Sequence, residues 1–340
     1  MKIVVDAFGG DNAPLEILKG AEMAVKELDV DILLSGDEAA IRKCASDNGI
    51  SLARMEILQA PDILTMHDEP GEVIKSKSNS SLAVGLKALA EDKGDAFVSA
   101  GSTGAVVVGS TFIVKRMRGV KRAALASFIP SRDGYFLLLD IGANAECRPE
   151  MLVQFAVMGS VYMKQVQGME NPTVGLLNIG VEESKGGELQ RQAFALLQQA
   201  PVNFIGNVEA RDIPAGVCDI VVTDGFTGNV VLKLTEGVAG TMFGMVKGIF
   251  MEGFKSKLAA ALVMPGLKGL KSKMDYATIG GAPLMGISKP VIKAHGSSNA
   301  LAIKNAIRQA KRSVEGDMVG TIAADLAKFA AASKAAEQQA

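Results

Sequence analysis

Four stretches of this chain have the pattern of a buried apolar strand that runs into a short loop rich in Gly, Ser, Thr and Asn and then into a helix. They span residues 96–105, 135–146, 174–187 and 219–229. In a parallel α/β sheet, such loops gather at the carboxyl ends of the strands, where ligands bind. Helix N-termini that open from Gly-rich loops favour anions, because unpaired N–H groups and the helix dipole both attract negative charge. The pattern indicates a phosphate-handling enzyme, although each loop taken alone also fits a simple tight turn.

The composition is that of a large globular chain in a reducing compartment. With 340 residues, 48% hydrophobic and 21% charged, it can bury the core of one large α/β domain or two lobes. A formal net charge of -1 argues against a nucleic-acid-binding protein as a whole. Cys44, Cys147 and Cys218 are far apart, which predicts free thiols and no structural zinc site. The first residues read as a strand and no apolar run approaches about 18 residues, so neither a signal peptide nor a membrane-spanning helix is expected.

Strand and helix signals alternate along most of the chain. Strands are expected at residues 2–6 and 31–35, and helices at 14–28, 37–49, 80–92 and from Pro149 onward. A turn at 131–134 joins apolar runs at 125–129 and 135–140 into a β-hairpin. This alternation is typical of βαβ units. It predicts a three-layer, doubly wound, mostly parallel α/β sheet with one hairpin, forming a single domain over residues 1–332 followed by a tail at 333–340.

Few residues of the usual catalytic types are present. The chain has two histidines, His67 and His295, and lacks the serine-hydrolase, zinc-protease, P-loop and dinucleotide fingerprints. Its prominent loop cation is Lys185, which follows Glu182 and Glu183. A site of neutral donors and one cation suits a nucleophile that is already ionised. Inorganic phosphate attacking a thioester meets that condition, because the departing thiol has a pKa of about 8.5 and the protein need only position the reactants and stabilise the oxyanion.

Seven short motifs, in order along the chain, resemble those of one family. They are DAFGGDNAP at 6–14, KSKSNSS at 75–81, SAGSTGA at 99–105, DIGAN at 140–144, NIGVEESKG at 178–186, DGFTGNV at 224–230 and HGSS at 295–298. Through them the chain closely resembles the PlsX-type acyl-[acyl-carrier-protein]:phosphate acyltransferases, to about residue 330.

The resemblance implies a fold like that of isocitrate and isopropylmalate dehydrogenases, related to phosphotransacetylases, in a homodimer without a bound cofactor or metal. It implies reversible transfer of a fatty acyl group from acyl-carrier protein to inorganic phosphate. The acyl-phosphate would then pass to a membrane glycerol-3-phosphate acyltransferase, which starts phospholipid (phosphatidic acid) synthesis.

The same resemblance implies roles for particular residues. Lys185 would stabilise the phosphate or the oxyanion, and the Asn229 amide would donate to the thioester oxygen or the phosphate. The implied substrate-binding residues are Ser99, Gly101, Ser102, Thr103, Gly104, Asn144, Asn178, Asp224, Thr227, His295, Ser297 and Ser298. Without the resemblance, Lys185 reads as a solvated loop lysine, Asn229 as a helix cap and His295 as a structural histidine. His67 ranks below His295, and Cys147 reads as a small buried thiol.

Two basic regions predict contacts with partners. One, at residues 115–122, would suit the acidic surface of a carrier protein, with a solvated helix end as the alternative. Its basic residues are Lys115, Arg116, Arg118, Lys121 and Arg122. The other, at 253–274, carries five lysines and no acidic residue around the apolar stretch 258–267, where Pro265 would break a helix. An apolar tip between cationic arms resembles an interfacial membrane anchor.

Upstream of this tip, four glycines form a small-residue stripe at helical spacing, which permits close helix contact within the fold or in a dimer. They are Gly237, Gly240, Gly244 and Gly248. Residues 235–275 are therefore expected to form a projecting helical segment for dimer or membrane contact, in a cytoplasmic protein that associates peripherally with the membrane.

Two other functions stay open. A phosphotransacetylase that uses acyl-CoA would need the same loops. A non-catalytic acyl-phosphate or phosphate-binding sensor would keep the loops without needing Lys185 and Asn229 together. A dehydrogenase of the related fold is disfavoured, because neither a nicotinamide fingerprint nor an acidic metal cluster is evident.

Overall fold

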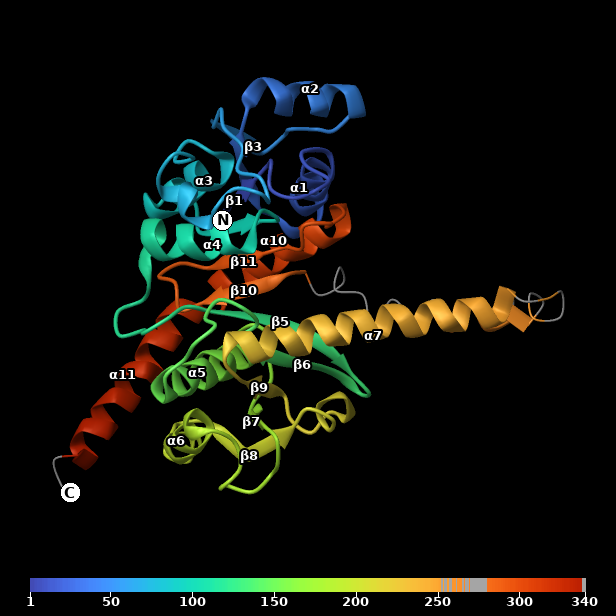
Figure 1. The fold of residues 1–340 in the computed structure, drawn as a ribbon. Helices are drawn as coiled ribbons and strands as arrows, with labels where there is room; N and C mark the ends of the chain where they lie inside the picture. The colour runs from blue at the N-terminus through green and yellow to red at the C-terminus, as the bar shows by residue number, and fades with distance from the viewer. Residues whose placement is uncertain are drawn as a thin grey trace.

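The computed structural model describes residues 1–251 and 280–337 and, between them, residues 253, 256, 259–260, 262–264, 266 and 269. Eleven strands of this described part form one sheet (Figure 1). They are β1 (Lys2–Asp6), β2 (Asp31–Gly36), β3 (Met55–Gln59), β4 (Ala96–Ser99), β5 (Ala124–Ser131), β6 (Gly134–Leu139), β7 (Thr173–Asn178), β8 (Asn203–Glu209), β9 (Ile220–Val222), β10 (Ala282–Met285) and β11 (Val291–Lys293).

Helices connect most of the strands. They are α1 (Leu15–Leu28), α2 (Glu38–Asn48), α3 (Ser81–Ala90), α4 (Thr103–Gly109), α5 (Pro149–Gln165), α6 (Glu188–Leu197), α7 (Gly225–Met251), α10 (Ala300–Glu315) and α11 (Met318–Glu337), with shorter turns of helix at Pro70–Ile74, Ser110–Lys115 and Ile213–Ala215.

Local signals in the sequence placed several of these elements correctly. Asp37 caps α2 by accepting a hydrogen bond from the Ala40 N–H at 2.7 Å. Gly49 ends the same helix with a φ of +64°, a conformation that glycine adopts without strain. Pro149 begins α5, and β5 pairs with β6 as the expected antiparallel hairpin.

The sheet consists of two parallel groups that run in opposite directions. Its order is β3-β2-β1-β4-β11-β10-β5-β6-β9-β7-β8. The strands from β3 to β11 in this order are mutually parallel, as are those from β6 to β8. Between the groups, the pairs β11–β10, β10–β5 and β5–β6 are antiparallel. Three reversals separate β4 from β6, so the expectation that all four Gly-rich loops share one sheet edge is wrong. The loops after β6, β7 and β9 share an edge, whereas the loop after β4 belongs to the opposite group.

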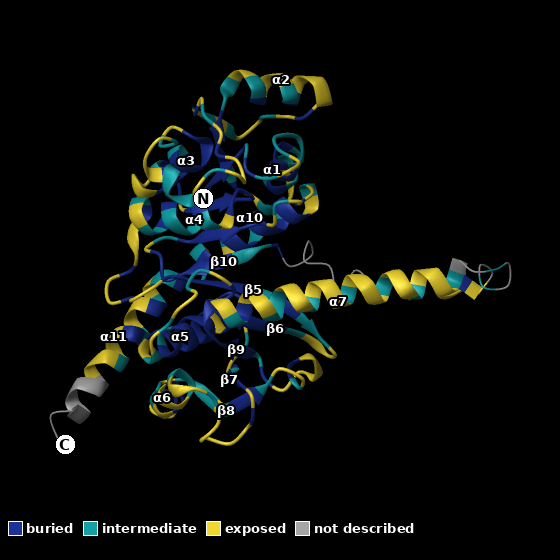
Figure 2. Ribbon diagram, viewed as in Figure 1, coloured by how far each residue is buried: buried dark blue, intermediate teal, exposed yellow. Residues whose placement is uncertain are grey.

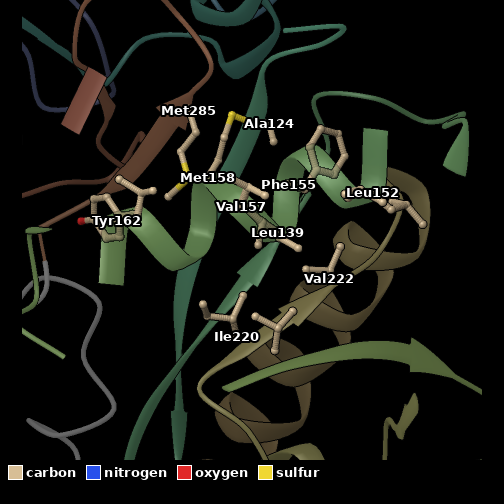
Figure 3. Packing of buried hydrophobic residues seen from close by; sticks show 14 of the residues in the cluster. Ala124, Leu139, Leu152, Phe155, Val157, Met158, Tyr162, Ile220, Val222 and Met285 are labelled. Carbon is tan, nitrogen blue, oxygen red and sulfur yellow. The ribbon is translucent and has the colours of Figure 1, made fainter. Parts of the chain in front are cut away.

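Helices cover both faces of the sheet, as the three-layer prediction requires (Figure 1). On one face, α1 and α10 pack on the first strand group, and α5, α6 and α11 pack on the second. Figure 3 shows Phe155 and Met158 of α5 packed with Leu139 of β6 and Val222 of β9. Each large apolar side chain buried in this way stabilises the fold by about 1.5–3 kcal/mol. On the other face, α3 and α4 cover the first group, and α7 begins beside β6.

Helix α7 projects away from the body, and most of its length is exposed (Figure 2). Exposed apolar side chains recur on it at helical spacing, namely Val230, Leu234, Val238, Met242, Met245 and Ile249. Contiguous apolar surface of this kind marks a contact site more often than plain solvent-facing helix.

Part of the predicted tip lies within the described residues. Leu262, Val263 and Met264 are helical and exposed, with Leu262 at 81%. Pro265, Leu267 and the five lysines that flank the tip lie outside the described residues. No helix in the described ranges has a long enough apolar stretch to cross a membrane.

Candidate active site

A cavity of about 320 Å³ lies over the middle of the sheet, where the two strand groups meet. Its lining comes from β5, from the loops after β4, β6 and β11, from the start of β10 and from the first turns of α7. The apolar part of the wall includes Leu125, Ile141 and Leu232, and the polar part includes Thr103, Asn229, Lys293 and His295. The cavity can therefore hold a molecule with an apolar end and an anionic or carbonyl end.

The loop after β6 is organised by the carboxylate of Asp140, which is fully buried. It accepts hydrogen bonds from the backbone N–H groups of Leu125, Gly142, Ala143 and Asn144, at 2.7–3.2 Å, and from the Asn144 side-chain amide at 2.8 Å. Burial raises the pKa of Asp140, and the hydrogen bonds oppose that rise. Because every partner is a hydrogen-bond donor, the ionised carboxylate, whose two oxygens only accept, suits this loop better than the protonated acid.

The first turn of α7 is packed tightly against this loop. Asp224 caps the helix by accepting from the N–H and the hydroxyl of Thr227, both at 2.8 Å. A Cβ at Gly228 would lie 1.9 Å from the carbonyl oxygen of Asp140, so only glycine fits there. The helix begins at Gly225, so Asn229 lies inside it and is not its cap, which corrects that interpretation. Asn229 lines the cavity beside Gly142.

Lys185 lies on the long loop between β7 and α6 and is exposed. Asn178 shapes this loop, because its side-chain amide donates to the Lys185 carbonyl at 3.1 Å and its side-chain oxygen accepts from the Ile179 N–H at 2.8 Å. Lys185 does not line the cavity. Its loop leaves the same sheet edge as the loop that leads to Asn229, because β7 and β9 are adjacent and parallel.

The loop after β4 reaches the cavity from the other strand group. Thr103 and Gly104 line the cavity, whereas Ser99 is buried beneath them. The Ser99 hydroxyl donates to Asp6 at 2.7 Å and accepts from the Gly101 N–H at 3.0 Å. Ser99 and Gly101 thus hold the loop in place.

The HGSS segment follows β11. His295 lines the cavity, and its Nδ1 accepts from the Ser297 N–H at 3.3 Å and lies 2.8 Å from the Ser297 hydroxyl. Burial and the nearby Lys293 ammonium lower the pKa of His295, so the ring is neutral at pH 7, with its proton on Nε2. Ser298 is buried, and its hydroxyl has no hydrogen-bond partner within the part of the chain that the structure describes.

Comparison with known proteins places the chain in a family. A family model described as "Fatty acid synthesis protein" matches residues 1–320. A phosphate acyltransferase of Oceanobacillus iheyensis is 50% identical over 95% of this chain and 97% of its own length. One from Brevibacillus brevis is 49% identical over 96% of this chain and 98% of its own length. The chain belongs to this phosphate acyltransferase family. It is therefore an acyltransferase of fatty acid and phospholipid synthesis.

Solved structures confirm the fold predicted for this acyltransferase. A EutD phosphotransacetylase from Staphylococcus aureus matches with a TM-score of 0.62 at 19% identity, over 92% of this chain and 94% of that one. A phosphotransacetylase from Streptococcus pyogenes matches with a TM-score of 0.64 at 18% identity, over 93% of this chain and 94% of that one.

The acyltransferase fold brings together four of the residues suggested for its site, since Thr103, Gly104, Asn229 and His295 share the cavity wall. The other suggested residues do not line the cavity and lie at strand ends, in loops or in the first turn of α7, namely Ser99, Gly101, Ser102, Asn144, Asn178, Lys185, Asp224, Thr227, Ser297 and Ser298.

The structure shows two further residues of the acyltransferase at the site that the sequence analysis did not name as site residues. Lys293 lines the cavity although it is just 7% exposed, and Asp140 organises the cavity loop. The signal for Lys293 was a charged residue that ends an apolar strand two residues before His295, and the signal for Asp140 was its place as the first residue of the DIGAN motif, directly after an apolar strand.

The described residues of the acyltransferase form neither a metal site nor an activated thiol nucleophile. Among them, no group of three His, Cys, Asp or Glu side chains could hold a metal ion. Burial and the neighbouring Asp140 carboxylate raise the pKa of Cys147 to about 11. The thiol is therefore protonated at neutral pH and is a poor nucleophile.

Proposed function

We propose that this acyltransferase moves a fatty acyl group from the thioester of acyl-carrier protein to inorganic phosphate. The observation that carries the proposal is that one part of the cavity wall is apolar and another part is polar. Leu125, Ile141 and Leu232 can contact the first carbons of an acyl chain, while Asn229 and Thr103 can donate hydrogen bonds to its carbonyl group and to phosphate.

The chemistry follows from this arrangement. A phosphate oxygen attacks the thioester carbon, forming a C–O bond and a tetrahedral oxyanion. The C–S bond then breaks, and the thiolate leaves with its electron pair and takes a proton from water. The Asn229 amide stabilises the oxyanion, and Lys185 stabilises the phosphate charge from the neighbouring β7–α6 loop. No general base is needed, because phosphate is already ionised.

The acyl-carrier donor is supported by the basic cluster at residues 115–122. All five of its basic side chains are exposed, and none forms an ion pair within the described residues. An acidic carrier protein would complement this surface and would be steered toward it.

Incubation with phosphate and a long-chain thioester, followed by hydroxylamine trapping, tests the proposed function. Acyl-carrier protein is expected to give acyl-phosphate without added metal or nucleotide, with a higher kcat/KM than acyl-CoA of the same chain length. A higher kcat/KM with acyl-CoA would favour the phosphotransacetylase function. Phosphate binding without turnover of either donor would favour a sensor, and release of fatty acid alone would refute phosphate as the acceptor.

We further propose two contact surfaces. The apolar stripe of α7, together with the exposed glycines Gly237, Gly240, Gly244 and Gly248, supports a homodimer, because small residues permit close helix packing. The exposed apolar residues Leu262 and Val263 support direct contact with an anionic membrane, beside the membrane acyltransferase that would use the product.

Paired variants separate these two surfaces. Met242→Lys with Met245→Lys is expected to yield monomers by light scattering, because two charges would enter the dimer contact. Leu262→Glu with Val263→Glu is expected to keep the dimer and full activity on soluble donor, but to lose sedimentation with phosphatidylglycerol vesicles, since apolar burial and lipid attraction both decline. A monomeric wild type would refute the dimer, and vesicle binding that is absent in wild type or unchanged in the folded Glu variant would refute the anchor.

A further inference from the structure

A buried ammonium group lies at the wall of the cavity. Lys293 is the last residue of β11 and is only 7% exposed, yet it lines the cavity together with His295 and Asn229. Its Nζ donates hydrogen bonds to the carbonyl oxygens of Ala100, at 3.4 Å, and of Ala294. An ammonium group has three protons to donate, so these two contacts leave one donor for a further partner.

The charge of this group is not neutralised by the described part of the protein. Within those residues, no carboxylate oxygen lies within 4.0 Å of Lys293 Nζ, and Asp6 and Asp11 act on it only from farther away. Burial lowers the pKa of Lys293 to about 8, and the attraction of those two carboxylates opposes the change. A buried cation without a counter-ion is unfavourable in a purely structural role. It is, however, suited to a site that receives an anion.

The neighbouring carboxylate, that of Asp6, already accepts hydrogen bonds from other groups. Asp6 is buried and accepts from the Ser99 hydroxyl at 2.7 Å and from the Phe8 N–H at 3.3 Å. Across the cavity, Lys233 is exposed and paired with Glu236 at 2.8 Å. Lys293 is therefore the buried, unpaired cation among the described residues of the cavity wall.

We propose that Lys293 binds the phosphate substrate and stabilises the negative charge of the tetrahedral intermediate. This inference rests on the proposed function, and it places a cation inside the cavity, where Lys185 does not reach in this structure. In this arrangement Lys293 holds phosphate at the β4–β11 side, and Asn229 on α7 faces the carbonyl group.

Direct measurement of phosphate binding tests the inference without acyl transfer. In calorimetric titration with inorganic phosphate, Lys293→Met is expected to raise Kd about 10- to 100-fold, the typical effect of losing a charged hydrogen bond. Its KM for phosphate is expected to rise similarly, with the KM for the acyl donor unchanged. Lys304→Met is the matched control, because Lys304 is also largely buried but pairs with Glu27 away from the cavity. This control is expected to bind phosphate like wild type.

The pH dependence provides a second readout. The binding-competent ammonium form exists below the pKa, so phosphate affinity of the wild type is expected to fall as pH rises through about 8. Lys293→Arg, whose charge does not titrate in this range, is expected to bind phosphate without that decline. The other titratable groups around the position are Asp6, Asp11, His295, Lys233 and Glu236, and all of them remain in this variant.

The outcomes are distinct. If wild type does not bind phosphate and makes no acyl-phosphate, the proposed function fails. If wild type does both and folded Lys293→Met binds phosphate equally well, this inference alone fails. Should Lys293→Met unfold, a Lys293→Arg variant that binds phosphate with the unaltered decline near pH 8 would overturn it as well.

Discussion

Asn229→Ala is expected to lower turnover about 100- to 1000-fold, the usual effect of removing a donor aimed at a developing oxyanion. Lys185→Ala is expected to lower turnover by a similar factor, because the charge proposed to offset that of the phosphate would be lost. Asn229 lines the cavity from a helix turn that Asp224 caps, so the helix already places it at the cavity wall. Lys185 lies on an exposed loop that a hydrogen bond from Asn178 holds in shape. Because neither side chain is part of the apolar core, the melting temperature is expected to stay close to that of wild type.

Steady-state kinetics of acyl-phosphate formation measures both effects. Asn48→Ala and Lys43→Ala serve as matched controls, because both residues are exposed on α2 and distant in the fold from the cavity loops. They are expected to leave kcat unchanged. Near-wild-type turnover in folded Asn229→Ala or Lys185→Ala would remove that residue from the mechanism.

Gly228→Ala is expected to have the largest effect on the fold and the site together. The added methyl group would lie 1.9 Å from the Asp140 carbonyl oxygen and 3.0 Å from Thr223 Cγ2, so the start of α7 must shift. Overpacking of this kind costs about 3 kcal/mol of unfolding free energy. A shift of about 1 Å at the adjacent Asn229 would reduce turnover about 100-fold.

Gly134→Ala, at the start of β6, is the matched control. A Cβ there meets no atom within 4 Å and the residue is exposed, so the substitution is expected to change stability by less than about 0.5 kcal/mol. Melting temperature and kcat are measured for both variants, and only Gly228→Ala is expected to lower them. Equal melting temperatures and equal activity would show that the contact between Gly228 and Asp140 does not position the site.

Much of the fold could be predicted because its signals are local. The cap at Asp37, the stop at Gly49 and the hairpin turn before Gly134 depend on residues within a few positions of each other. The direction of the two strand groups could not be predicted in this way. It is set by pairing of β10 with β5, at Leu284 and Leu125, which are remote in sequence.

The residues of the candidate site differ in the same way, because some lie in recognisable local motifs and others do not. Motifs pointed to Asn229 and His295, which do line the cavity. Lys293 was missed, because a single lysine at a strand end has no local pattern that separates a buried cation from a solvated one. Its burial becomes evident only when the loop after β4 and the HGSS segment lie on either side of it, as the carbonyls of Ala100 and Ala294 do.

The geometry of α7 joins the chemistry of the cavity to the outer end of the molecule. Asn229 and Glu236 line the cavity from its first turns, and Met251, at the other end of the same continuous helix, lies about 22 Å farther along the axis than Glu236 at 1.5 Å per residue. A continuous helix of this length is stiff, so a tilt of its outer end would also tilt its inner turns. Binding of a partner or a membrane at the outer end, as proposed above, would therefore change the position of Asn229 relative to the sheet.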